Sequence, residues 1–229
     1  MICLLSALGE ELFPFREALE HATEEQASGR LWNRGTLEGR EVVLGVAGVG
    51  KVMAASACQA ALDNFHPEKV LFTGIAGAFH PDLTRGDLLV ARDCLQYDLD
   101  PSLFGLAPGQ IPPPGQGLYP GDPAMLEAAE TFHPRGYRIS FGRILTADIF
   151  LTPSILPLWA DKIAALKGDA VDMEGAAAAL PAYLGRVPFL LIRSISDQVQ
   201  SGPVKGFRGI VRQGSARCLE LVRWILRRP

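Results

Sequence analysis

The sequence predicts an α/β fold in a single domain, on three observations. Short apolar runs typical of buried strands alternate along the chain with segments whose spacing is typical of helices. Most of the strand-like runs are apolar on both faces, as expected of a mainly parallel sheet covered by helices. The length of 229 residues lies within the range of one α/β domain.

The N-terminal part begins with an apolar run at residues 2–7, which predicts the first strand. Residues 11–20 follow as a helix, because their apolar side chains recur on one side. A second strand, 41–47, is rich in valine and leads into an alanine-rich helix at 51–65. Residues 69–73 form the third expected strand, so the order is strand, helix, strand, helix, strand.

The C-terminal part continues this alternation. Leucine and β-branched residues predict four further strands, at residues 87–91, 137–145, 169–171 and 187–194. Residues 175–184, which are small and apolar, predict a buried helix between the last two strands. The long helix expected at 206–228 ends in arginines, which complement the helix dipole at its C-terminus.

Residues 101–123 hold the densest group of proline and glycine in the chain and are expected to be neither strand nor helix. Such a segment is often a linker between domains. The alternation on its two sides belongs to one α/β series, however, which favours an ordered excursion within one domain spanning residues 1–229.

Composition excludes several classes of protein. The net charge of −3 and a sequence pI near 5.8 argue against a main partner that is nucleic acid or an anionic membrane. The four cysteines are far apart and form no CxxC or Cys/His pair, so neither a disulfide framework nor a metal site is indicated. Because no basic segment precedes the first apolar run and no run is long enough to span a membrane, we expect a cytoplasmic protein.

Acidic residues follow three of the expected strands. Glu11 comes after the first strand, Glu174 after the sixth and Asp197 after the seventh. Because ligands of α/β sheets bind beyond the carboxyl ends of the strands, these residues are candidates for one site. Each also has a structural interpretation: Glu11 and Glu174 suit the first turn of a helix, and Asp197 suits a turn or a pair with Arg193.

Two glycine-rich segments give weaker evidence for a ligand-binding site. Residues 74–77 allow a ligand to approach the backbone closely, but such turns are common after strands. Residues 45–52 match the first three fixed positions of a phosphate-binding GxxxxGK[ST] loop, and Val52 fails the fourth, which must supply a hydroxyl. Nucleoside triphosphate binding is therefore not predicted, and neither a cofactor nor a catalytic histidine is expected.

Seven segments resemble those of the 5′-methylthioadenosine/S-adenosylhomocysteine nucleosidases, in the same order and with similar spacing. They are residues 5–11 (LSALGEE), 48–52 (GVGKV), 73–77 (TGIAG), 86–87 (GD), 104–112, 172–175 (DMEG) and 193–197 (RSISD). The resemblance covers nearly the whole chain. It implies a nucleoside phosphorylase-like, three-layer α/β/α domain with a central, mostly parallel mixed sheet.

The resemblance also implies an activity, hydrolysis of the N-glycosidic bond of a 5′-substituted purine nucleoside, for which carboxylates in distinct roles are apt. It implies that Asp197 donates a proton toward N7 of the purine, and that Glu11 activates the attacking water with Arg193 nearby. Glu174 would hold the ribose hydroxyls and Met173 would pack on the sugar.

Residues 148–151 resemble the family's base-binding segment, in which Phe150 would stack on the base and the Leu151 backbone would read its edge. The remaining substrate-binding residues that the resemblance implies are Leu8, Ile75, Ala76, Gly77, Ser196 and Phe207. The family forms homodimers in which the segment matching residues 101–114 closes the neighbour's 5′ pocket. That segment would contribute Pro101, Phe104, Leu106 and Pro112.

The sequence leaves alternatives for the nucleophile, the 5′ group, the base and the activity itself. A phosphorylase would need cations and hydroxyls for phosphate, whereas Glu10 and Glu11 would repel it, so water is favoured as nucleophile. Leu8, Ile75 and Leu106 depart from common residues of the family and leave the 5′ group undecided. Asp197 suits adenine; futalosine hydrolases of menaquinone biosynthesis, which release hypoxanthine, are the alternative. A nucleoside-binding module without turnover is a further alternative, but the presence of Glu11, Glu174 and Asp197 favours an enzyme.

Overall fold

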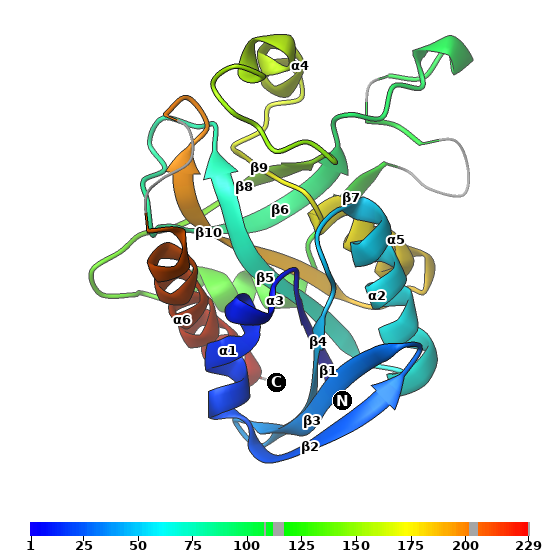
Figure 1. Ribbon diagram of the computed structural model, residues 1–229, viewed down its shortest axis with the longest axis vertical. Coiled ribbons are helices and arrows are strands. Elements are labelled where there is room, and N and C mark those ends of the chain that lie inside the picture. The colour runs from blue at the N-terminus through cyan, green and yellow to red at the C-terminus, as the bar shows by residue number, and fades with distance from the viewer. Residues whose placement is uncertain (108, 112–116, 202–205, 229) are drawn as a thin grey trace.

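A ten-stranded mixed sheet organises the protein, whose computed structural model describes residues 1–107, 109–111, 117–201 and 206–228 (Figure 1). The strands lie in the order β10-β6-β8-β9-β5-β1-β4-β3-β2, and β7 pairs with β6. Their bounds are β1 Ile2–Ser6, β2 Glu20–Ala27, β3 Arg30–Leu37, β4 Arg40–Val46, β5 Lys69–Ala78, β6 Leu88–Gln96, β7 Leu118–Pro120, β8 Ile139–Thr146, β9 Ala170–Asp172 and β10 Phe189–Gln198.

Parallel pairing brings the ends of the central strands together. β1 pairs in parallel with β4 and β5, and β5 pairs in parallel with β10. The strand β9 instead runs antiparallel to the last part of β5, with Val171 opposite Gly77. Because β9 runs in the direction opposite to β5, its last residue, Asp172, lies beside the last part of β5, in the region where β1, β5 and β10 also end.

Five of the strands, β5, β10, β6, β8 and β9, form a closed part of the sheet. β10 pairs with β5 in parallel and with β6 in antiparallel fashion, while β6, β8 and β9 continue the sheet back to β5. These five strands therefore form a closed ring, which removes their exposed edges. The strands β1, β4, β3 and β2 continue from β5 as an open part of the same sheet.

Helices cover the sheet in two groups, which gives three layers and confirms the predicted fold class (Figure 1). α1 and α6 pack together on one side, and α2 and α5 pack together on the other. Each group covers its own cluster of buried apolar side chains. The helix bounds are α1 Gly9–Ala18, α2 Lys51–Phe65, α3 Pro123–Glu130, α4 Ala160–Ala165, α5 Gly175–Leu184 and α6 Phe207–Leu226.

Some local predictions were wrong. Glu20 belongs to β2 rather than to the first helix, because α1 ends at Ala18 and Leu19 turns to an extended conformation that buries its side chain. The hairpin of β2 and β3 was not predicted, since every side chain of β2 is at least partly exposed and its sequence lacks an apolar face.

The proline-rich segment also contains regular structure, contrary to the expectation of neither strand nor helix. It holds a 3-10 turn at Ser102–Phe104 and the strand β7, and α3 begins at Pro123. Asp122 caps α3 by accepting a hydrogen bond from the Met125 amide at 2.9 Å, and proline suits the first helical position.

Two strands extend further than expected, and both extensions matter for the site. The glycine segment 74–77, predicted as a turn, continues β5 as far as Ala78. β10 continues through Ser196 and Asp197 to Gln198. Glycine in a strand interior is typical of close approach by another group.

Other features concern ions and membranes. Cys3, Cys58, Cys94 and Cys218 are free and buried. Among the described residues, no group of three or more histidine, cysteine or acidic side chains is arranged to hold a metal ion. None of the helices in that part of the chain has the length and apolar character needed to cross a membrane.

Candidate active site

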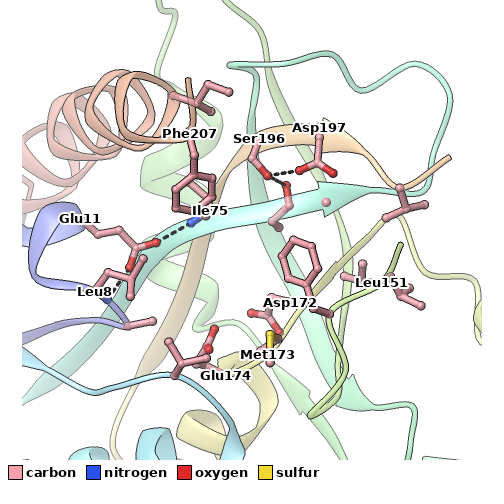
Figure 2. Close-up of a pocket in the computed structure, with 18 of the residues that line it drawn as sticks. Leu8, Glu11, Ile75, Leu151, Asp172, Met173, Glu174, Ser196, Asp197 and Phe207 are labelled. Atoms are coloured by element: carbon pink, nitrogen blue, oxygen red, sulfur yellow. Dashed lines mark hydrogen bonds between the residues drawn. The ribbon is translucent and has the colours of Figure 1, made fainter. Parts of the chain in front are cut away.

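A cavity of about 220 Å³ lies where the ends of β1, β5, β9 and β10 meet. Side chains from β5, β9 and β10, from the segments that follow β1, β4, β8 and β9, and from the start of α6 line it (Figure 2). The lining residues are Ala7, Leu8, Glu11, Val49, Ile75, Ala76, Gly77, Ile149, Phe150, Leu151, Val171, Asp172, Met173, Glu174, Ser196, Asp197, Val199, Phe207 and Ile210.

Glu11 is held rigidly at one side of this cavity. The side chain is 2% exposed, its Oε2 accepts a hydrogen bond from the Leu8 amide at 2.8 Å, and its Oε1 accepts one from the Ile75 amide at 3.1 Å. Burial raises the pKa of Glu11, while Arg193 and the amides act in the opposite direction. A carboxylate with a raised pKa holds a proton more readily, which suits a general base.

Arg193 lies beneath the cavity and does not line it. The guanidinium is fully buried, and its Nε and Nη2 donate to Asp172 Oδ2 at 2.9 and 2.7 Å. Its Nη2 also lies 3.5 Å from Glu174 Oε2. Within the described residues Nη1 has no hydrogen-bond partner, and it lies beside Gly74 near Glu11. Arg193 therefore neutralises part of a buried acidic cluster.

Asp172 is the residue that orders this cluster. Besides Arg193, it accepts hydrogen bonds from the Thr146 hydroxyl at 2.6 Å and the Gly175 amide at 3.0 Å. The hydrogen bond from the Gly175 amide also fixes the start of α5. Asp172 was not among the predicted site residues. It is an acid at the end of the strand that Glu174 follows, and this position could have identified it as a candidate.

Glu174 enters the cavity from the turn between β9 and α5. Its Oε1 accepts a hydrogen bond from the Gly50 amide at 3.0 Å, and the residue is 6% exposed. Burial raises its pKa to about 7; Arg193 lowers it, and Asp172 and Glu11 add to the rise. Met173 lies beside Glu174 at the same wall of the cavity (Figure 2).

A bulge in β10 presents two neighbouring residues to the cavity. The register shifts between Ile195, opposite Ala76, and Asp197, opposite Gly77, so Ser196 is the additional residue. In a regular strand, adjacent side chains point to opposite faces, whereas here both Ser196 and Asp197 line the cavity. The Ser196 hydroxyl is hydrogen-bonded to the Asp197 carboxylate and lies 3.1 Å from the Ala76 carbonyl.

The carboxyl groups of Glu11 and Asp197 come from different walls of the cavity (Figure 2). Glu11 and Glu174 belong to the side near α1 and α2, and Asp197 lies toward the far end of β10. This separation leaves room for a ligand with acidic groups on two sides. General acid and general base roles can then be divided between them.

Apolar groups line the rest of the cavity. Phe150 is 54% exposed at the rim, and Leu151 is buried beneath it. Leu8, Ile75 and Phe207 gather at the Glu11 side (Figure 2). The lining contains no lysine, arginine or histidine among the described residues, so a dianion would meet no cation there.

The structure brings most of the predicted site residues together. The predicted residues that line the cavity are Leu8, Glu11, Ile75, Ala76, Gly77, Phe150, Leu151, Met173, Glu174, Ser196, Asp197 and Phe207. Pro101, Phe104 and Leu106 do not line this chain's cavity, and Pro112 lies outside the described residues. The apolar lining residues Ala7, Val49, Ile149, Val171, Val199 and Ile210 were missed, because an apolar side chain by itself carries no functional signal.

Comparisons with known proteins agree with this geometry. The family model described as "Phosphorylase superfamily" matches residues 1–227. A 5′-methylthioadenosine/S-adenosylhomocysteine nucleosidase of Anoxybacillus flavithermus is 34% identical over 228 residues, which cover 96% of this chain and 95% of the relative. The chain belongs to this nucleosidase family. Membership confirms the resemblance and the enzyme class, an N-glycosyl hydrolase of purine nucleosides.

Solved structures of the family share the fold. The nucleosidase from Colwellia psychrerythraea in complex with adenine has a TM-score of 0.91 and 29% identity, covering 98% of this chain and 93% of that chain. The nucleosidase from Neisseria meningitidis in complex with methylthio-immucillin-A has a TM-score of 0.90 and 28% identity, covering 99% and 98%. The predicted nucleoside phosphorylase-like architecture is therefore confirmed.

Proposed function

We propose that this member of the family hydrolyses the N-glycosidic bond of a 5′-substituted adenine nucleoside and releases adenine. The observation that carries the proposal is the placement of Glu11 and Asp197 on different walls of one cavity that also contains Glu174. Glycosidic hydrolysis needs an acid at the leaving group and a base at the water, and these groups must lie on different sides of the sugar.

In the proposed mechanism, Asp197 donates a proton to N7 of the purine as the bond from N9 to the ribose C1′ breaks. The electron pair of that bond stays with the base, and positive charge develops on the ribosyl group as in an oxocarbenium ion. Protonation makes adenine a better leaving group. Ser196, hydrogen-bonded to the Asp197 carboxylate, would orient that acid.

Water would attack C1′ while Glu11 accepts its proton. The two amides that bind Glu11 hold its carboxylate in place, and its raised pKa favours proton transfer. Arg193 would act from beneath the cavity, by positioning the acidic cluster and balancing its charge. Glu174 would accept hydrogen bonds from the ribose hydroxyls, with Met173 packed on the sugar.

The base and the 5′ group would occupy the apolar parts of the cavity. Phe150 would stack on adenine, and the backbone of Leu151 would hydrogen-bond its edge. Leu8, Ile75 and Phe207 would surround the 5′ substituent together with residues of a second copy of the chain. Leu103 and Phe104 are 97% and 77% exposed, which supports the proposal that the segment with Pro101 and Leu106 closes the cavity of a partner in a homodimer. We propose that this homodimer is cytoplasmic.

The experiment is substrate profiling with and without phosphate. Purified protein would be incubated with methylthioadenosine, S-adenosylhomocysteine, aminofutalosine and futalosine, and released bases would be separated by chromatography. We expect adenine release at a rate independent of phosphate, since the described lining offers no cation to bind it. Phosphate-dependent cleavage would identify a phosphorylase, hypoxanthine from futalosine alone a futalosine hydrolase, and no base release a non-catalytic nucleoside-binding protein.

A further inference from the structure

The N-terminus of α2 contacts both halves of the cavity. The Gly50 amide donates to Glu174 Oε1 at 3.0 Å, on the side proposed for the ribose. The next amide, Lys51 N, donates to Asp148 Oδ1 at 2.7 Å, at the start of the segment proposed for the base. Two successive amides at the start of one helix therefore bind two carboxylates: Glu174, which lines the cavity, and Asp148, which precedes the lining residues Ile149 to Leu151.

The Lys51 side chain strengthens the second of these contacts. Its Nζ lies 2.7 Å from Asp98 Oδ1 and 3.9 Å from Asp148 Oδ2, and the side chains of Lys51 and Asp98 are only 19% and 14% exposed. The other oxygen of Asp98 accepts a hydrogen bond from the Asp148 amide at 3.1 Å. Asp98 thus joins Lys51 to the backbone of the base-binding segment.

This geometry explains a motif that the catalytic mechanism does not use. The sequence from Gly45 to Lys51 resembles a phosphate-binding loop, yet the lysine is paired with Asp98 and the helix amides bind carboxylates. Gly50 has a φ of +92°, and a Cβ there would lie 3.0 Å from Asp148 Oδ1. The loop is shaped to receive carboxylates of the protein itself.

We propose that Lys51 and Asp98 are positioning residues that hold the segment from Asp148 to Leu151 in register with the ribose-binding Glu174. Neither Lys51 nor Asp98 lines the cavity, so neither is placed to contact a nucleoside bound in it. Their effect on catalysis passes through the backbone of the base-binding segment. The inference rests on the proposed function, because it takes the base to bind at Phe150 and Leu151.

The test compares adenine binding and turnover in Lys51→Met and wild type. Loosening the base-binding segment is expected to weaken adenine binding, measured by calorimetry, by about tenfold, and to raise KM by a similar factor. We expect kcat to fall by less than about threefold and its pH profile to keep its midpoint, because Glu174 retains its bond to the Gly50 backbone. Lys51→Arg keeps the charge and is expected to restore adenine binding.

Two further variants separate positioning from folding. Arg40→Met removes an exposed ion pair with Glu68 at the start of β4 and is the matched control, expected to bind adenine as wild type does. Asp98→Asn is the second probe should Lys51→Met fail to fold. Since Lys51 acts mainly through its ion pair with Asp98, Lys51→Met combined with Asp98→Asn is expected to be no worse than Lys51→Met alone.

The outcomes distinguish this inference from the proposed function. Wild-type affinity and KM in folded Lys51→Met or Asp98→Asn would overturn the positioning role while leaving the nucleosidase intact. A proportional loss of kcat with unchanged adenine affinity would also overturn it. A wild-type protein that neither binds adenine nor releases it would overturn the proposed function and this inference together.

Discussion

Replacing Glu174 by glutamine is expected to stabilise the protein at neutral and alkaline pH while impairing nucleoside binding. The residue is 6% exposed, and burial raises its pKa to about 7 despite the nearby Arg193. Ionisation of Glu174 is therefore less favourable in the folded protein than in the unfolded chain. Glutamine keeps an oxygen for the Gly50 amide but cannot ionise, so it resembles the protonated form.

The magnitude follows from the difference between the folded and the ordinary pKa. A rise from 4.5 to about 7 corresponds to about 3 kcal/mol of unfolding free energy. Because folding raises the pKa, this stability is present below pH 4.5 and is lost as the pH rises through about 7. The advantage of Glu174→Gln over wild type is thus expected to grow by about 2 kcal/mol between about pH 5.5 and pH 8.

Urea unfolding of both proteins across this pH range tests the prediction. Any constant effect of the amide beside Arg193 cancels, because only the change of the difference with pH is used. Glu10→Gln, at an exposed position one residue before Glu11, is the control. A difference that is constant, or that shrinks as the pH rises, would refute the reasoning. Nucleoside affinity should fall in the same variant, since the ribose hydroxyls lose a charged acceptor.

Three other substitutions probe the remaining parts of the site. Arg193→Met leaves the buried Asp172 without its cation and should lower the unfolding free energy by about 3–5 kcal/mol in urea titrations; a loss below about 1 kcal/mol would contradict this. Gly74→Ala places a Cβ 2.8 Å from Glu11 Oε1 and closer still to Arg193, so it displaces the Glu11 carboxylate and should lower kcat about 100-fold. An unchanged kcat would argue against Glu11 as the base. Phe150→Ala should raise KM about tenfold or more through lost stacking, with a smaller effect on kcat, and an unchanged KM would place the base elsewhere.

Buried regular elements could be predicted well from the sequence. The helices at Lys51–Phe65 and Gly175–Leu184 have the predicted bounds, because glycine at one end or a clear apolar run marks each of them. The hairpin of β2 and β3 could not be predicted in this way. β2 lies at the edge of the sheet and is polar, so hydrogen bonds to β3, rather than a buried face, make it a strand.

The candidate site was predicted from acids at strand ends, and their detailed placement came from tertiary structure. The antiparallel entry of β9 brings Asp172 and Glu174 back toward β5, which no local pattern shows. The bulge at Ser196 is equally invisible, since it depends on the register with β5. Lys51 was misleading for the same reason: its partner Asp98 is 47 residues away in the chain.

The most direct test of the central claim is adenine release by wild type and Asp197→Asn, measured together with binding of methylthioadenosine. Wild type is expected to release adenine without phosphate. The variant should bind the nucleoside within about tenfold of wild type and release no adenine, because the amide cannot donate the proton that the leaving base requires. Retained adenine release by folded Asp197→Asn would contradict the assignment of Asp197 as the acid.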